Sequence, residues 1–287
     1  LIPISRLLVA VLAAAPESGH GPPSGRFPTI VAHRGASADA PENTLAAFRL
    51  GFEQGAEVIE GDFRLTRDGR IIAMHDADLA RTTGDPRRVS EVTLEDVRRL
   101  DAGSWGRWRG SRFEGEPVPT LEEVLAIVPP ERGILVEIKD SPRIVEALLD
   151  ALRDSGLEAD QVAIISFDAS VIESLKRASP KWKAFWLTSF KRRDGAWTPT
   201  AEEVVGTAQL IGADGVDVKA ESKVVDEDFV RAVRAAGLEL HVWTVNESGL
   251  ADRLRNLGVD SITTDRPAGL RREMSRDTDR RLDGDPP

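Results

Sequence analysis

Short runs of β-branched residues alternate with longer amphipathic segments between Thr29 and Pro267, and this alternation restricts the possible folds more than any other feature. Strands and helices that alternate in this way are typical of βαβ units, in which consecutive strands lie parallel. The runs that we expect to form strands are Ile30–His33, Val58–Arg64, Ile134–Lys139, Val162–Phe167, Ala184–Leu187, Gly215–Val218, Leu240–Val245 and Ser261–Thr264. Eight parallel strands suit a closed barrel, and 287 residues are enough for one α/β barrel of about 250 residues.

The interval 76–120 interrupts this alternation directly after the second expected strand. It contains no clear strand and little periodic helix beyond Leu94–Leu100, and Trp105, Trp108 and Phe113 lie among its glycine and arginine residues. Aromatic residues in such a segment indicate a small inserted subdomain, although a disordered loop has a similar composition. We expect an insertion here.

The two ends of the chain differ in composition from the part between them. Residues 1–27 contain the apolar run Leu7–Ala15, which is too short to span a bilayer, and then a stretch rich in proline and glycine. They are typical either of the end of a secretory signal or of a disordered extension without a targeting role. The first interpretation makes the protein secreted or periplasmic, and the second makes it cytoplasmic. Residues 271–287 are highly charged, and we expect a disordered tail with at most a helical turn or two.

The overall composition excludes several classes of function. A formal net charge of −10 argues against a nucleic-acid-binding surface, because binding to a phosphate backbone requires clustered lysine and arginine. The chain has no cysteine, so disulfides, thiolate metal sites and thiol nucleophiles are ruled out. A small phosphate-containing ligand remains compatible with this composition.

Acidic side chains lie at the ends of two expected strands. Side chains of a strand alternate in direction, so Glu60 and Asp62 point to one face, as do Glu137 and Lys139. Three carboxylates that converge at the mouth of a barrel repel one another unless a divalent cation lies between them or one keeps a proton. We favour a cation. A site of oxygen ligands predicts Mg²⁺, Ca²⁺ or Mn²⁺. Two nearby histidines mean that Zn²⁺ is not excluded.

The position of His75 depends on a predicted hairpin. If Asp68 and Gly69 form the two-residue turn that this dipeptide favours, Asp62 is paired directly with His75. A three- or four-residue turn would shift this register by about one residue. The hairpin therefore brings His75 close to the predicted cation site. The alternative is a strand-end histidine that is solvated or bonded to Asp76.

Two further groups follow the first expected strand. His33 ends that strand and Arg34 follows it, so an imidazole and a guanidinium reach the same end of the barrel. Arg34 can hold a phosphate through two nitrogens and Lys139 can add a positive charge, while His33 and His75 can exchange protons near neutral pH. The alternative for His33 is a histidine packed in the core.

Motifs along most of the chain resemble those of the glycerophosphodiester phosphodiesterase family, in its short bacterial form. The resemblance covers residues 28–270. The matching segments are Ala32–Gly35, Pro41–Thr44, Glu60–Asp62, Thr66–Gly69, His75–Asp76, Arg81–Gly84, Leu100–Trp105, Pro119–Glu123, Glu137–Lys139, Ser166–Asp168, Trp243–Asn246 and Thr264–Pro267.

The resemblance implies a TIM (β/α)8 barrel with an inserted subdomain at residues 76–120. It also implies hydrolysis of small glycerophosphodiesters to sn-glycerol 3-phosphate and an alcohol, with one divalent cation, Mg²⁺ or Ca²⁺ before Mn²⁺. The implied roles are metal binding for Glu60, Asp62 and Glu137, general acid and base catalysis for His33 and His75, and substrate binding for Arg34, Lys139 and Trp243.

Other functions remain open on the same residues. A sphingomyelinase D-like or phosphatidylinositol phospholipase-like barrel could share the histidines and acids, although the insertion motifs disfavour it. A non-catalytic binding barrel is a further alternative, because one fold hosts many functions. No nucleic-acid partner and no stable membrane span are expected.

Overall fold

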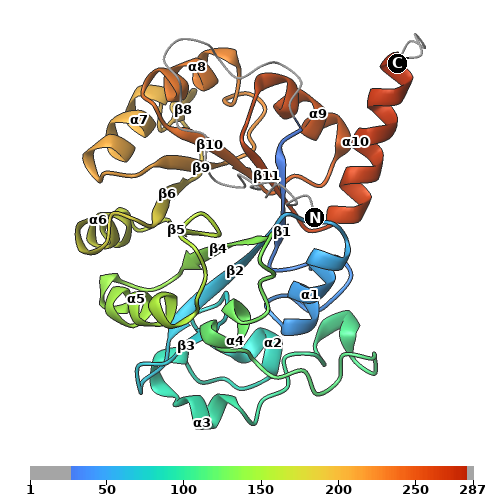
Figure 1. The fold of residues 1–287 in the computed structure, drawn as a ribbon, viewed down its shortest axis with the longest axis vertical. Coiled ribbons are helices and arrows are strands. Elements are labelled where there is room, and N and C mark those ends of the chain that lie inside the picture. The colour runs from blue at the N-terminus through green and yellow to red at the C-terminus, as the bar shows by residue number, and fades with distance from the viewer. Residues whose placement is uncertain (1–26, 283–287) are drawn as a thin grey trace, which may run out of the picture.

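The computed structural model describes residues 27–282 and confirms the predicted α/β barrel (Figure 1). Its eight parallel strands are, in order around the barrel, β1 (Thr29–His33), β11 (Ser261–Thr264), β10 (Glu239–Trp243), β9 (Gly215–Lys219), β6 (Lys183–Thr188), β5 (Val162–Ser166), β4 (Gly133–Ile138) and β2 (Val58–Leu65). Pairing between β1 and β2 closes the ring. The carboxyl ends of all eight strands therefore meet at one end of the barrel.

Helices surround the strands in the βα order that the sequence predicts (Figure 1). They are α1 (Leu45–Glu53), α4 (Leu121–Leu125), α5 (Val145–Asp154), α6 (Ala169–Ala178), α7 (Ala201–Leu210), α8 (Glu227–Ala235), α9 (Ser248–Leu257) and α10 (Pro267–Leu282). A short 3₁₀ turn, η3 (Pro142–Ile144), precedes α5. Side-chain caps define several starts: Thr44 Oγ1 accepts a hydrogen bond from Ala47 N at 3.2 Å, and Asp226 Oδ1 accepts one from Phe229 N at 3.0 Å.

Alternate residues of each strand pack on opposite sides of the barrel wall. Val31, Leu135, Ile165 and Phe185 belong to the cluster that fills the interior. Their outward-facing neighbours, such as Ile134, join the larger cluster between the strands and the helices. Both faces of the wall are thus apolar, which explains why the strands appear in the sequence as continuous β-branched runs.

The hairpin after β2 differs from the predicted one by one residue. Strand β3 (Ile71–Ala73) pairs antiparallel with β2, and Arg64 lies opposite Ile72, so Asp62 is aligned with Met74 rather than with His75. The loop has three residues, because Thr66 N donates to Arg70 O at 2.8 Å and Gly69 adopts a φ of +77°. The prediction of a two-residue turn was therefore wrong, and a type I turn followed by a left-handed glycine replaces it.

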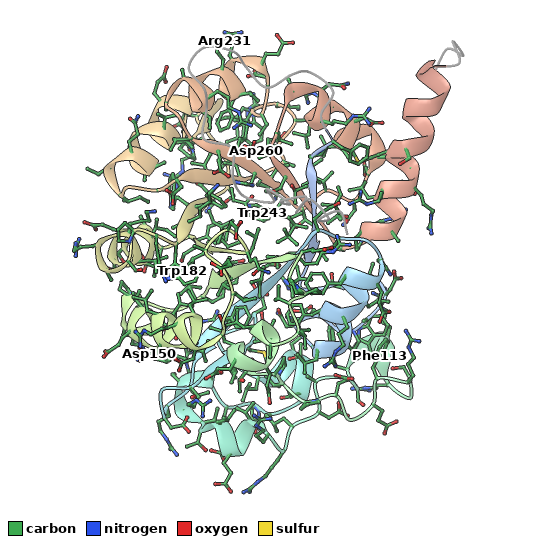
Figure 2. The ribbon with its side chains drawn as sticks, in the orientation of Figure 1. Phe113, Asp150, Trp182, Arg231, Trp243 and Asp260 are labelled. Atoms are coloured by element: carbon green, nitrogen blue, oxygen red, sulfur yellow. The ribbon has the colours of Figure 1, made fainter. Side chains whose placement is uncertain are left out.

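The segment between β3 and α4 packs around apolar residues of its own. Its helical turns are α2 (Ala80–Thr83), η1 (Val89–Glu91), α3 (Leu94–Val97) and η2 (Gly106–Trp108). Leu79, Val92 and Val97 are buried together with Ile72 of the hairpin. Phe113 lies over α1 instead, beside Ala47 (Figure 2). The segment therefore contacts the barrel through both β3 and α1.

A second small sheet lies between β6 and α7. Its strands β7 (Lys191–Arg193) and β8 (Ala196–Thr198) pair antiparallel with each other. The sequence did not predict them, because three charged, exposed residues in a row carry no alternating apolar pattern.

The charged segment after the barrel is more ordered than predicted. Helix α10 continues to Leu282, whereas we expected a disordered tail from residue 271. Leu270 and Met274 lie one turn apart, both fully buried, and Arg271 binds the carbonyl oxygen of Gly55 at 3.1 Å. This narrow apolar stripe anchors the helix and is hidden in the composition by charged neighbours. Residues 283–287 lie outside the described part, as does the predicted signal-like or disordered extension up to residue 26. Among the described residues, none of the helices combines the length and apolarity needed to cross a membrane.

Candidate active site

Three buried carboxylates meet at the carboxyl end of the barrel. Glu60 and Asp62 lie two residues apart on β2, and Asp62 is paired directly with Glu137 on β4. One carboxylate oxygen from each of the three residues can be chosen so that all three oxygens lie within 4.8 Å of one another. The three residues are 2%, 0% and 6% exposed. The structure thus brings together the three acids that the sequence singled out.

Each of these carboxylates affects the ionisation of the others. Burial, together with the charge of Asp62, raises the pKa of Glu137 to about 8 and also raises the pKa of Glu60. Burial opposes ionisation of Asp62 as well, but the charges of Arg34 and Lys139 lower its pKa below the ordinary value. Glu60 Oε1 is buried without a hydrogen-bond partner among residues 27–282. A cluster of this kind could hold a divalent cation, which would replace the retained protons.

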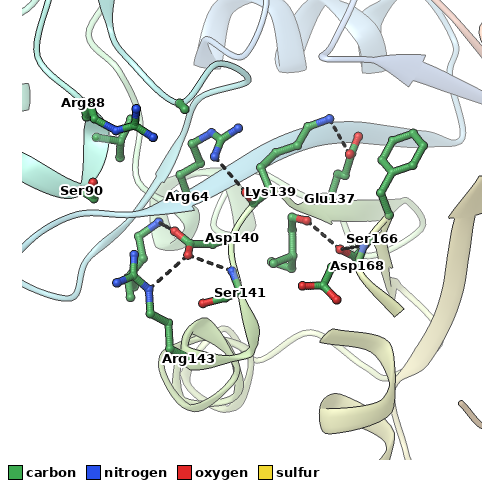
Figure 3. Close-up of a pocket in the computed structure, with 15 residues that line it drawn as sticks. Arg64, Arg88, Ser90, Glu137, Lys139, Asp140, Ser141, Arg143, Ser166 and Asp168 are labelled. Carbon is green, nitrogen blue, oxygen red and sulfur yellow. Dashed lines mark hydrogen bonds and ion pairs between the residues drawn. The ribbon is translucent and has the colours of Figure 1, made fainter. Parts of the chain in front are cut away.

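Two cationic side chains border the acidic cluster. Arg34 Nε lies 3.1 Å from Asp62 Oδ2. Lys139 Nζ lies 3.1 Å from Asp62 Oδ1. The same atom lies 2.5 Å from Glu137 Oε1 (Figure 3). Both side chains therefore lie where a phosphate bound at the cluster would meet them.

The backbone around Arg34 is held in an uncommon conformation. Arg34 and Asn43 have φ values of +54° and +58°, which non-glycine residues seldom adopt. Asn43 Nδ2 donates to Asp62 Oδ2 at 2.8 Å, and its Oδ1 accepts from Asp62 N at 3.1 Å. Arg34 N in turn donates to Glu60 Oε2 at 2.9 Å. The first βα loop is thereby bound to both acids of β2.

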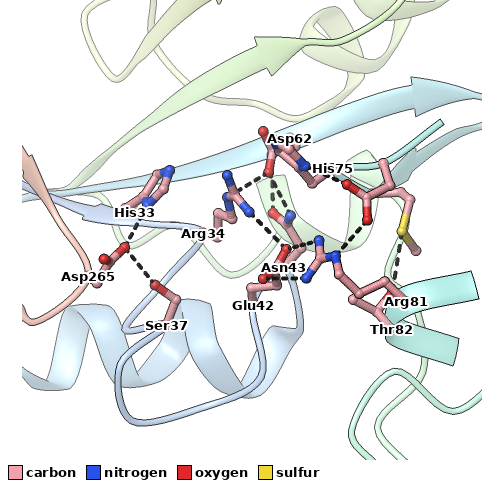
Figure 4. Close-up of polar contacts among 12 residues, drawn as sticks. His33, Arg34, Ser37, Glu42, Asn43, Asp62, His75, Arg81, Thr82 and Asp265 are labelled. Carbon is pink, nitrogen blue, oxygen red and sulfur yellow. Dashed lines mark hydrogen bonds and ion pairs between the residues drawn. The ribbon is translucent and has the colours of Figure 1, made fainter. Parts of the chain in front are cut away.

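His33 and His75 each have an aspartate on the same ring nitrogen (Figure 4). His33 Nδ1 lies 2.6 Å from Asp265 Oδ1, and His75 Nδ1 lies 2.8 Å from Asp76 Oδ1. The pKa of Asp265 is lowered to about 2, against burial, by its hydrogen bonds and charge interaction with His33, and that of Asp76 is also lowered. Both carboxylates are therefore ionised acceptors, so Nδ1 of each ring donates and Nε2 remains for proton exchange.

Further polar contacts hold the two aspartates in place. Asn246 Nδ2 and Ser37 Oγ donate to Asp265 at 2.6 and 3.1 Å. On the other side, Arg81 Nε donates to Asp76 Oδ2 at 2.6 Å, and its terminal nitrogens bind both oxygens of Glu42 (Figure 4). Because Glu42 also accepts a hydrogen bond from Arg34 at 3.0 Å, one ionic network connects the surroundings of His75 with Arg34.

The hairpin backbone is tied to the strand that carries Lys139. Arg64 Nε and Nη2 donate to the carbonyl oxygen of His75 at 3.0 and 2.8 Å, and Nη1 donates to that of Lys139 at 2.8 Å. These contacts fix the end of the hairpin beside β4, and the charge of Asp62 acts on the His75 ring there.

Trp243 lies at the end of β10 and packs against the interior cluster (Figure 2). Its Nε1 donates to Asp217 O at 3.3 Å, and its ring makes an edge contact with Phe167, with 5.6 Å between ring centroids. Phe167 is 46% exposed, so an aromatic pair borders the mouth of the barrel. A substrate contact for Trp243 stays a prediction.

Sequence reasoning did not single out the side chains that orient the other site residues, apart from naming Asp76 as an alternative partner of His75. These are Glu42, Asn43, Arg64, Asp76, Arg81, Asn246 and Asp265. Most of them lie inside the motifs that carry the resemblance, which was the available signal. Their contacts depend on loop conformation, which spacing alone does not define.

Fold and site together define an α/β-barrel enzyme whose mouth holds a cluster of three buried carboxylates between two aspartate-paired histidines. The family model described as "Glycerophosphoryl diester phosphodiesterase family" matches residues 33–269, and the chain belongs to this family. The enzyme class is accordingly that of phosphoric diester hydrolases.

Known proteins of this family resemble the chain over most of its length. A glycerophosphodiester phosphodiesterase of Bacillus subtilis is 34% identical to this chain. The match covers 83% of each of the two proteins. A glycerophosphodiester phosphodiesterase of Caldanaerobacter subterraneus subsp. tengcongensis is 32% identical, over 84% of this chain and 95% of its own. The structure of an Oleispira antarctica phosphodiesterase, solved in complex with the product sn-glycerol-3-phosphate, superposes with a TM-score of 0.75 at 26% identity, covering 87% of this chain and 97% of that one.

Proposed function

We propose that this chain hydrolyses glycerophosphodiesters to sn-glycerol 3-phosphate and an alcohol, using one divalent cation and two histidines. The observation that carries the proposal is the placement of the buried acidic cluster between two imidazoles whose Nδ1 atoms are both held by ionised aspartates. Membership of the family and the product bound to the Oleispira antarctica relative support the substrate class.

Glu60, Asp62 and Glu137 would hold the cation. Three carboxylates form an all-oxygen donor set, which fits Mg²⁺ or Ca²⁺ best and Mn²⁺ next. A cation bound there stabilises negative charge on the phosphoryl oxygens. The unpartnered Glu60 Oε1 fits this assignment, because a buried carboxylate oxygen without a hydrogen bond is otherwise costly.

Arg34 and Lys139 would bind the phosphate. The charge of Asp62 raises the pKa of both groups, although burial acts in the opposite direction, so both stay protonated. Two fixed cations beside the reacting phosphorus stabilise the charge that builds up on its oxygens during attack. Trp243 would line the neighbouring part of the site, near the glycerol or the leaving alcohol.

The two histidines would carry the proton transfers through Nε2. One removes a proton from water, or from the neighbouring glycerol hydroxyl if a cyclic phosphate forms first, and the other protonates the departing alcohol oxygen. Burial lowers the pKa of His75, which favours its neutral form near pH 7. Asp265 and Asp76 keep each ring in the tautomer that this exchange requires.

The decisive experiment measures release of glycerol 3-phosphate from glycerophosphocholine and glycerophosphoglycerol. We expect activity with added Mg²⁺, Ca²⁺ or Mn²⁺, loss of activity in a chelator, and restoration by a single ion. His33→Ala and His75→Ala should each lower kcat by about 10²-fold or more, the range that one positioned acid or base contributes.

Two outcomes would contradict the proposal. The first is hydrolysis of choline sphingolipids without any release of glycerol 3-phosphate from soluble diesters. The second is full activity of both histidine variants, which would leave the imidazoles without a catalytic role.

A further inference from the structure

A pocket of about 440 Å³ opens beside the acidic cluster (Figure 3). Glu137 and Lys139 form part of its wall, so the pocket is continuous with the proposed reaction site. Its volume lies within the range of small-molecule sites. The glycerophosphate half of a diester would occupy the cluster itself, which leaves this pocket for the alcohol on the other side of the phosphorus.

The side of the pocket away from Glu137 carries arginines with unused donors (Figure 3). The guanidinium of Arg88 is exposed and makes no ion pair with any of the described residues. Arg143 contacts Asp140 Oδ1 through Nε alone, at 3.2 Å, so its two terminal nitrogens keep no protein partner within residues 27–282. Ser90 and Ser141 add exposed hydroxyl groups to the same side.

The acidic residues of the pocket are partly engaged, and Asp168 Oδ2 is the oxygen without a partner among the described residues. Asp140 accepts hydrogen bonds from Ser141 N at 2.9 Å and Leu65 N at 3.2 Å. Asp168 accepts two from Ser170 at the start of α6, at 2.9 and 2.6 Å. The groups left for a ligand are therefore mainly donors. Four basic and three acidic side chains line the pocket, so its lining also carries one excess positive charge.

The aromatic wall of the pocket does not favour a cationic ligand. Lys139 Nζ already lies over the Phe167 ring, 5.7 Å from its centroid. A quaternary ammonium group would compete with this lysine for the ring and would meet Arg88 and Arg143 on the other side. A headgroup such as choline is therefore poorly matched.

We propose, resting on the function proposed above, that this pocket receives the leaving alcohol and selects alcohols that carry a second anionic group, a phosphate or a carboxylate. Arg88 and Arg143 bind this group through their free nitrogens, and guanidinium groups suit both anions because their planar fork matches two oxygens. The two arginines are specificity residues and take no part in the bond-breaking step.

The test compares four soluble diesters by kcat/KM for release of glycerol 3-phosphate. Glycerophosphoinositol 4-phosphate offers a second phosphate, glycerophosphoglycerate a carboxylate, glycerophosphoglycerol no charge and glycerophosphocholine a cation. We expect one or both anionic diesters to exceed the neutral one and the choline diester to be the poorest. The preferred anion, phosphate or carboxylate, identifies the source of the second charge.

Variants assign the preference to the pocket. Arg88→Ala and Arg143→Ala should each lower the anionic-to-neutral ratio of kcat/KM about fivefold, as expected for a partly exposed charged contact, and leave glycerophosphoglycerol turnover unchanged. Arg88→Lys should recover part of the ratio. Arg153→Ala is the matched control. Arg153 pairs with an aspartate three residues earlier, as Arg143 does. Unlike Arg143, it does not line the pocket.

The results separate this inference from the proposed function. Suppose that all four diesters release glycerol 3-phosphate. A preference for the choline diester then overturns the inference alone. An anionic-to-neutral ratio of kcat/KM that is unchanged in the Arg88→Ala/Arg143→Ala double variant does the same. No release from any of them under any divalent ion overturns the proposed function, and the inference with it.

Discussion

Asp265 shows how much of the site depends on single contacts between distant residues. Its Oδ1 lies 2.6 Å from Nδ1 of His33, although 232 positions separate the two in the sequence. Its second oxygen is bound to Asn246. The carboxylate is thus fixed on both oxygens and in turn fixes the imidazole, so Asp265 is a positioning residue for His33.

Replacing this carboxylate should disturb proton transfer more than substrate binding. In Asp265→Asn the amide no longer requires the Nδ1–H tautomer, so we expect kcat to fall by about 10²-fold with little change in KM. The pH profile of kcat should also change, because the variant lacks the negative charge beside the imidazole. Asp228→Asn, at an exposed position of α8, is the control. An unchanged pH profile and kcat would show that Asp265 does not act through His33.

Glu137 allows a test of cation binding that does not rely on activity. Its pKa of about 8 means that the cluster resists full ionisation without a cation. Glu137→Gln should remove one ligand and one repelling charge, so the metal-free variant should unfold at a higher temperature than the wild type above pH 8. Added Mg²⁺ or Ca²⁺ should then raise the melting temperature of the wild type and not that of the variant.

Thermal unfolding with and without chelator measures both effects. Glu131→Gln, which alters an exposed glutamate next to β4, serves as the matched control. An equal rise in melting temperature on metal addition for wild type and Glu137→Gln would show that the ion binds elsewhere.

Four of the five central residues could be predicted because they lie on strands, whereas His75 was placed near them through a turn that is one residue longer than predicted. His33, Glu60, Asp62 and Glu137 belong to strands that the β-branched runs define. The aspartates behind the histidines could not be assigned in this way. Whether a loop carboxylate points toward an imidazole depends on dihedral angles that neither periodicity nor spacing determines.

At the scale of elements, the first βα loop and the β2–β3 hairpin both depend on a left-handed glycine, for different reasons. At Gly69, φ is +77° and an added Cβ would meet no atom within 4 Å. At Gly35, φ is +80° and a Cβ would lie 2.3 Å from the carbonyl carbon of Ala47. Only the second position combines backbone strain with a steric clash.

This difference predicts unequal costs for one substitution. Gly69→Ala should lower the free energy of unfolding by about 1 kcal/mol, the cost of a left-handed alanine. Gly35→Ala should lower it by more than about 2 kcal/mol, because the clash with Ala47 forces α1 away from the loop that carries Arg34. Urea unfolding of both variants measures the two values, and a similar small loss in both would mean that the loop relaxes freely.

The elements themselves were predictable to the extent that they bury apolar surface with a regular period. All eight barrel strands appear in the sequence because both of their faces are covered. The register of the hairpin was missed by one residue, because Thr66 closes a three-residue loop through its backbone and side chain. Helix α10 was cut short in the prediction because its buried apolar residues Leu270 and Met274 stand among charged neighbours in the sequence.

At the scale of the whole molecule, the barrel interior contains a carboxyl group that the proposed reaction does not use. Asp217 lies on β9, is 1% exposed and has no hydrogen-bond partner for either side-chain oxygen among the described residues. Its register neighbours are Leu187 on β6 and His241 on β10, and His241 in turn lies 3.5 Å from Glu239. Burial raises the pKa of Asp217 to about 7, although the charge of His241 acts in the opposite direction.

This carboxyl should make the stability of the barrel depend on pH. Between the unfolded value of 3.8 and about 7, the native state keeps the proton that the unfolded state has lost. The unfolded state thus binds fewer protons, and stability falls as pH rises through this window. Asp217→Asn lacks the titration, so its free energy of unfolding relative to wild type should increase by about 2 to 3 kcal/mol from pH 5 to pH 8. Urea denaturation of both proteins at the two pH values measures this change, and a difference that stays constant would show that Asp217 is already ionised in the folded barrel at pH 5.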